Sequence, residues 1–90
     1  MRFHSPLDDV QWDRAVRQHA QMRTNLQHLR RRFPPRGQKQ RAALRAYRNA
    51  IQDFGRELIK PRDRIDPEAL NALSIRIGAR FVAYVNSRLD

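Results

Sequence analysis

The sequence predicts an all-α protein, a small three-helix bundle within a single domain that spans residues 1–90. Apolar residues recur every three or four positions over three long segments, which is the pattern of amphipathic helices. Prolines separate these segments, and alternating runs of Val, Ile and Thr that indicate strands are absent. A chain of 90 residues buries one modest core and no deep cleft.

The first helix is predicted over residues 6–33. Ser5 is the expected N-cap and Pro6 suits the first helical position. The helix should end at Phe33, because two prolines follow and disfavour helical backbone before them. The expected apolar seam consists of Trp12, Val16, His19, Met22, Leu26, Leu29 and Phe33.

The second helix is predicted over residues 38–59 and forms a long antiparallel hairpin with the first. The connection FPPRG is short and stiff, so the two helices should lie side by side. A regular apolar stripe runs along the second helix: Leu44, Tyr47, Ile51, Phe54 and Leu58. We expect Phe33 and Tyr47 to pack in the core rather than to stack on bases. Gly55, inside the helix, indicates a close contact or a bend.

The third helix is predicted over residues 67–89, after a charged linker, with Asp66 as its N-cap and Pro67 at its first position. It has two apolar seams: Leu70, Leu73, Ile77, Phe81 and Tyr84 form the first, and Ala72, Ile75, Ala79, Val82 and Leu89 form the second. Two seams predict that helix 3 is the most buried, lying centrally against the other two helices. Alternatively, the second seam contacts another chain in a homo-oligomer or larger complex. Phe54, Ile77 and Phe81 are expected to be buried.

Positive charge is concentrated in the hairpin. The chain has a formal net charge of +10, and residues 14–52 contain eleven basic residues and no Asp or Glu. Such a block attracts polyanions. Arg23 and Arg30 flank the apolar seam, and we assign them to covering the core. The residues expected to bind nucleic acid or an acidic partner are Arg14, Arg17, Arg31, Arg32, Arg36, Lys39, Arg41, Arg45, Arg48, Gln52 and Arg56.

Few residues suggest catalysis, and we expect no enzyme activity, cofactor or metal site. The chain contains no cysteine and no Gly-rich phosphate loop. His19 and His28 project to opposite sides of the first helix, so they cannot share a metal ion. Asp53 and Glu57 are interpreted as surface ion-pair partners of neighbouring basic residues.

The preferred function is therefore non-enzymatic binding to the backbone of DNA or RNA, alone or as a small subunit of a nucleoprotein complex. Helices this long do not fit a helix-turn-helix, and RRM and KH signatures are absent, so sequence preference should be weak. The main alternative is a protein-interaction module or a small phage- or plasmid-type inhibitor. Its arginine-rich hairpin would bind an acidic protein surface or a nucleic-acid-processing machine. A third possibility is peripheral binding to anionic membrane. No apolar run is long enough to span a membrane, and we expect a cytoplasmic location.

Overall fold

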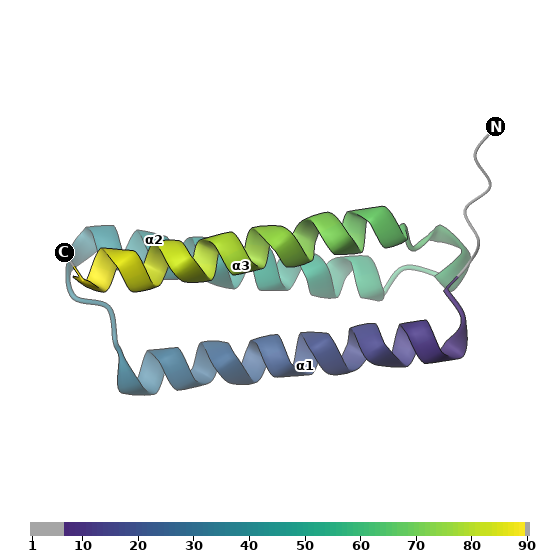
Figure 1. Ribbon diagram of the computed structural model, residues 1–90, viewed down its shortest axis with the longest axis horizontal. Coiled ribbons are helices and arrows are strands. Elements are labelled where there is room, and N and C mark those ends of the chain that lie inside the picture. Colours follow the sequence, from purple (N-terminus) through teal and green to yellow (C-terminus); the bar gives the residue numbers. More distant parts are fainter. Residues whose placement is uncertain (1–6, 90) are drawn as a thin grey trace.

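The computed structural model describes residues 7–89, which form three α-helices (Figure 1). Helix α1 spans Asp9–Arg32, α2 spans Gly37–Leu58 and α3 spans Pro67–Leu89. A short 3₁₀ helix, η1, covers Arg62–Arg64 between α2 and α3. The structure is 87% helical and has no strand within the described residues, so the predicted all-α bundle is confirmed.

Helix α2 is the central element of the bundle. It packs most closely against α3 and also contacts α1, whereas α1 and α3 have little direct backbone contact. In Figure 1, α1 runs along one side of the molecule, opposite the overlapping α2 and α3. Seven residues of α2 are buried, against four of α3. The prediction that helix 3 is the most buried is wrong, because α3 packs closely against one helix only.

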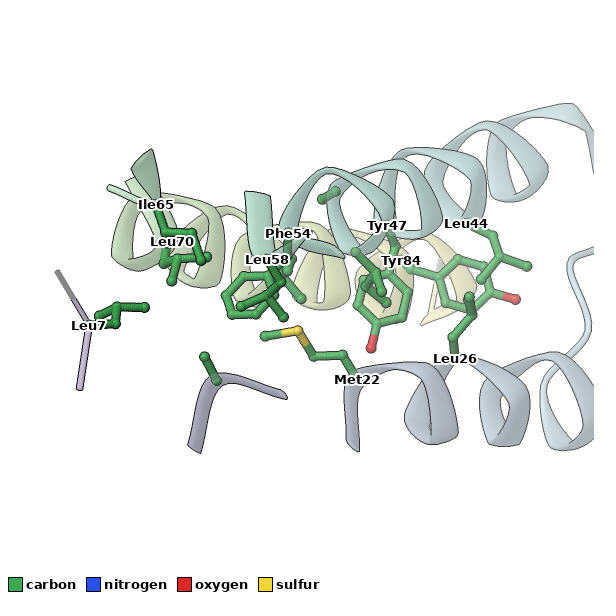
Figure 2. Close-up of a cluster of buried hydrophobic side chains, with 14 residues drawn as sticks. Leu7, Met22, Leu26, Leu44, Tyr47, Phe54, Leu58, Ile65, Leu70 and Tyr84 are labelled. Atoms are coloured by element: carbon green, nitrogen blue, oxygen red, sulfur yellow. The ribbon is translucent and has the colours of Figure 1, made fainter. Parts of the chain in front are cut away.

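The core gathers around the apolar stripe of α2 (Figure 2). All five predicted stripe residues are buried, and Phe54 is only 1% exposed. Helix α3 adds Leu70, Ile77 and Tyr84, and the linker adds Ile65. Prediction and structure therefore agree that Phe54 and Ile77 belong to the core.

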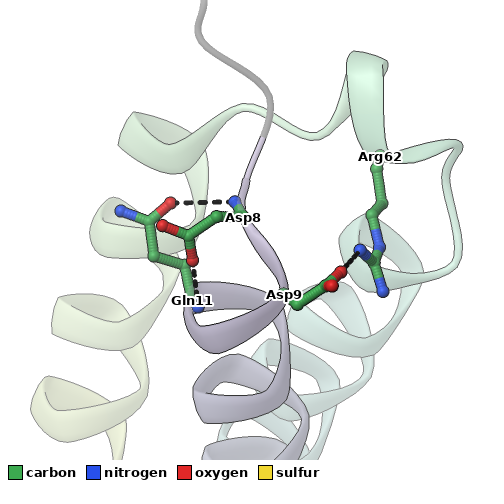
Figure 3. Close-up of polar contacts among 4 residues, drawn as sticks. All are labelled: Asp8, Asp9, Gln11 and Arg62. Atoms are coloured by element: carbon green, nitrogen blue, oxygen red, sulfur yellow. Dashed lines mark hydrogen bonds and ion pairs between the residues drawn. The ribbon is translucent and has the colours of Figure 1, made fainter.

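Two expectations for α1 are corrected. Its N-cap is Asp8, which forms a capping box with Gln11 (Figure 3). The Asp8 carboxylate accepts the Gln11 N–H at 2.7 Å, and the Gln11 side chain accepts the Asp8 N–H at 3.2 Å. This reciprocal pair satisfies two backbone donors, which favours a start at Asp9 rather than at residue 6. The predicted cap Ser5 and the adjoining Pro6 lie outside the described residues.

The apolar seam of α1 also differs from the prediction. Ala15 is buried in place of Val16, which is 37% exposed. At 100° per residue, position 15 lies about 20° from Met22 on the helix, whereas position 16 lies about 120° away. Phe33 follows the end of the helix and is 50% exposed, so it is not a core residue.

The C-terminal end of α3 is hydrogen-bonded to the turn between α1 and α2. The Tyr84 hydroxyl, fully buried with its ring, donates to the Phe33 carbonyl oxygen at 2.5 Å. The Arg88 guanidinium donates to the Pro34 carbonyl and lies 5.6 Å from the centre of the Phe33 ring. Because a buried phenol needs a hydrogen-bond partner, Tyr84 fixes where the turn sits relative to α3.

The opposite end of the bundle is organised by Glu57, which is buried rather than at the surface as predicted. Its carboxylate accepts the Asp66 N–H at 3.1 Å and pairs with the Lys60 ammonium at 2.6 Å. Asp66 in turn accepts the Glu68 N–H at 2.9 Å, which confirms it as the N-cap of α3. The predicted pair between Asp53 and Arg56 is present at the surface, at 3.2 Å.

The η1 segment contacts the start of α1. The Arg62 guanidinium pairs with the Asp9 carboxylate (Figure 3) and lies 4.7 Å from the centre of the Trp12 ring. This contact closes the end of the bundle at which the chain enters α1.

Phe81 is 39% exposed, so its predicted burial is corrected. It lies at the edge of α3, where its ring meets the Tyr47 ring edge-on at 5.8 Å.

Replacing Phe54 with Ala should lower the free energy of unfolding by about 3–5 kcal/mol. Replacing Phe81 with Ala should lower the free energy of unfolding by only about 1–2 kcal/mol, because the half-buried Phe81 side chain removes less apolar area from water. Urea denaturation of both variants measures the difference, and equal losses would contradict the placement of Phe81.

Gly55 lies against His19, which confirms a close contact at this position. A Cβ atom at Gly55 would lie 2.7 Å from His19 Nε2, whereas a Cβ at Gly78 of α3 would meet nothing within 4 Å.

Gly78→Ala should therefore stabilise the fold by about 0.5–1 kcal/mol through helix propensity. Gly55→Ala should lose this gain or destabilise the fold. Adding His19→Ala to Gly55→Ala should restore stability in thermal unfolding, and no restoration would show that the clash is not with His19.

Candidate nucleic-acid interface

An open groove runs between α1 and α2, formed by two adjoining hollows of about 600 Å³ and 350 Å³. Arg30 and Arg48 line both hollows, so the two are continuous. Among the described residues, the groove is lined by no residue of α3 and by no acidic side chain. Six arginines line what we call the arginine groove: Arg23 and Arg30 from α1, and Arg41, Arg45, Arg48 and Arg56 from α2.

Helical periodicity places the α2 arginines on one flank. They recur at intervals of three and four residues, and Gln52 completes the series between Arg48 and Arg56. The core stripe has the same spacing and lies on the adjacent side of α2. When Leu44 and Ile51 are buried in the core, the arginines therefore face α1. Side chains three or four residues apart lie about 5–6 Å from each other, which suits successive phosphates.

Most of this positive charge is not neutralised by residues 7–89. Arg56 pairs with Asp53, but both side chains are well exposed, so this pair is weak. Across residues 7–89, the other five groove arginines form no ion pair. The Nε–H of Arg48 is buried and has no hydrogen-bond acceptor in the described part of the chain. A buried donor without a partner is costly, so an anion that accepted this N–H would be stabilised there.

His19 forms one end of the groove. Its ring stacks on Phe54, with the ring centres 6.1 Å apart and the planes 11° from parallel. Burial, together with the nearby Arg23 guanidinium, holds the pKa of His19 below its usual value of 6.5, although the Ile51 carbonyl acts in the opposite direction. His19 is therefore predominantly neutral at pH 7 and contributes ring surface rather than charge.

The structure brings together only part of the predicted binding set. Arg41, Arg45, Arg48, Gln52 and Arg56 line the groove. Arg31, Arg32, Arg36 and Lys39 lie around the α1–α2 turn and are exposed. Arg14 and Arg17 lie towards the start of α1 and line other hollows.

Arg23 and Arg30, assigned to the core surface from the sequence, are groove residues. The signal that finds them is the register of the hairpin. The turn covers residues 33–36, and further along the hairpin His19 meets Gly55, so residues whose numbers sum to about 69–74 lie at similar levels. This pairing sets Arg30 opposite Arg41, and Arg23 opposite Arg48. Charges from both helices therefore face each other across one groove.

No family model, curated protein or solved structure matches this chain. Within residues 7–89, none of the helices combines the length and apolar character that crossing a membrane requires. The same residues contain no group of three or more His, Asp or Glu side chains arranged to hold a metal ion.

The lowered pKa of His19 predicts how stability depends on pH. Because folding lowers this pKa, the unfolded chain binds more protons than the folded chain as the pH falls below about 6.5. The contribution of His19 to stability should be fully present above pH 6.5 and should diminish on acidification. Urea denaturation near pH 7.5 and pH 5.5 should show this loss, and His19→Gln should make it smaller. An equal pH dependence in His19→Gln would contradict the prediction.

Proposed function

We propose that this protein is a non-enzymatic binder of nucleic-acid backbone, acting alone or as a small subunit of a nucleoprotein complex. The observation that supports the proposal is the arginine groove, where six arginines from two helices face one another and five lack an ion-pair partner in residues 7–89. A helix surface that serves only solubility usually mixes both signs of charge.

Like charges held together in a groove repel each other and attract polyanions. A phosphate backbone bound there releases its counterions, which favours binding irrespective of sequence. Arginine suits this role better than lysine, because its planar guanidinium donates two parallel hydrogen bonds to one phosphate. The groove contains Gln27 and Gln52 as further polar groups for phosphate and sugar oxygens. Recognition of this kind gives weak sequence preference, so we extend the proposal to both DNA and RNA.

An acidic protein surface is the second candidate. The floor of the groove includes the apolar side chains of Leu26 and Ile51, and Ile59 at its end is 83% exposed. An apolar floor between basic rims also suits an acidic amphipathic helix. In that case the protein is an interaction module, or a small inhibitor of a nucleic-acid-processing machine, that uses the same arginines.

Salt dependence of binding tests the proposal. Electrophoretic shifts with duplex DNA, single strands and structured RNA should give a log–log salt slope of about −4 to −5 on duplex, as four to six neutralised phosphates require. Replacing Arg41, Arg45 and Arg48 with Ala should flatten the slope by about 2–3. These variants should fold, because Ala favours helix and the positions lie outside the core stripe.

A matched triple variant separates the groove from net charge. Arg64, Arg76 and Arg80 are exposed and lie outside the groove, so replacing them with Ala removes the same charge. This control should bind nearly as tightly as the parent. Equal losses in both triple variants would point to nonspecific charge. A parent that does not bind nucleic acid at about 100 mM salt would favour the acidic protein partner.

A further inference from the structure

The outward face of α3 is apolar and exposed to solvent. It consists of the second predicted seam, Ala72, Ile75, Ala79, Val82 and Leu89, which we call the outer α3 seam. Ile75 is 66% exposed, Val82 53% and Leu89 80%, so the seam contributes little to the core. The expectation that helix 3 lies centrally, with both of its seams inside the bundle, is wrong: within residues 7–89, α3 packs closely against α2 only and its second seam is exposed.

The seam contains no charged residue, in a chain of which 31% is charged. Arg76 lies at the edge of the seam, about 40° from Ala72 and about 100° from Ile75 on the helix, and Arg80 lies farther from Ile75, at about 140°. Beside Leu89 the apolar surface continues into a hollow of about 400 Å³ between α1 and α3, which Phe33 and Phe81 help to line. A contiguous exposed apolar surface of this kind marks an interaction site.

The seam follows a heptad repeat, the pattern of helices that pair side by side. Ala72, Ala79 and Asn86 are seven residues apart, and Ile75, Val82 and Leu89 form a second series displaced by three. One series is thus small or polar and the other is large. The repeat faces away from the core, so it is not explained by packing within the chain.

We infer that the outer α3 seam binds a second copy of this chain, through an antiparallel α3–α3 pair. In such a pair, residues whose numbers sum to a constant lie opposite each other. With a sum of 161, Ala72 faces the partner's Leu89 and Ala79 faces the partner's Val82. Each small side chain thereby meets a large one, which allows close packing along the seam.

A parallel pair packs less well, because Ala72 would face the partner's Ala72 and Ala79 the partner's Ala79. In the antiparallel register like flanks of the two helices adjoin, so Arg76 lies beside the partner's Ala83 and away from the partner's Arg76. The register is self-complementary, as an interface with two-fold symmetry requires. Because no α3 residue lines the arginine groove, both copies of the groove stay open in the pair.

Sedimentation velocity of the full chain without nucleic acid tests this inference separately from the proposed function. At about 100 µM protein and about 300 mM NaCl, which screens repulsion between two chains of charge +10, we expect twice the mass of one chain. Lower salt should weaken the pair, the opposite of its effect on nucleic-acid binding. A monomer under these conditions would overturn the inference.

Val82→Glu should dissociate the pair and leave the helical circular dichroism unchanged, because Val82 is exposed. The matched control is Val10→Glu on α1, where the valine is 67% exposed and lies outside the seam. This variant should stay dimeric. A Val82→Glu variant that is folded and still dimeric would show that the contact lies elsewhere.

Disulfide trapping tests the register, and stays informative if Val82→Glu fails to fold. The chain has no cysteine, so Ala72→Cys and Leu89→Cys each introduce a single thiol. Under mild oxidation, a mixture of the two variants should form the mixed disulfide in preference to disulfides within either variant. Predominant linkage of Ala72→Cys to itself would show a parallel pair and overturn the antiparallel register.

Discussion

The position of α2 between α1 and α3 is the constraint on which the other features of this molecule depend. An amphipathic helix with two neighbours must divide its circumference among two contacts and solvent. On α2, the stripe that includes Tyr47 and Phe54 supplies the core, and the arginine series supplies the flank beside α1. Helix α3 has one close neighbour, so the apolar side chains of its outer seam are left exposed. Groove and seam are thus two consequences of one arrangement.

The contacts that hold α2 in place are polar as well as apolar. At one end Tyr84 donates to the Phe33 carbonyl, and at the other Glu57 accepts the Asp66 N–H. Both side chains are buried, so breaking either bond would leave a polar group without a partner. These bonds set the turn and the linker at the two ends of α2 and thereby its level relative to α1. That level decides which arginines face one another across the groove.

The sequence predicts most accurately those features that depend on a few neighbouring residues. Helix α3 begins at Pro67 because Asp66 caps it, and both were identified from local pattern. The start of α1 was missed because two capping signals lie close together, and the reciprocal bonds of Asp8 and Gln11 mark the observed start. The prediction that Phe81 is buried was wrong for a different reason. An apolar seam shows that a helix side avoids water, but the number of neighbouring helices is a property of the whole fold.

The candidate site shows the same division between local and tertiary information. A single helical wheel places Arg41, Arg45 and Arg48 on one flank, but the role of Arg23 and Arg30 emerges only when the two helices are paired in register. Repulsion among these charges disfavours the folded state unless an anion is present. The outer α3 seam likewise exposes apolar surface that water does not stabilise. Both surfaces cost the isolated chain stability, and each cost is relieved by association, with a polyanion at the groove and with a second copy at the seam. Since α3 takes no part in the groove, the two associations are compatible. A pair would then present two grooves to one extended polyanion, which raises its effective affinity without any new contact.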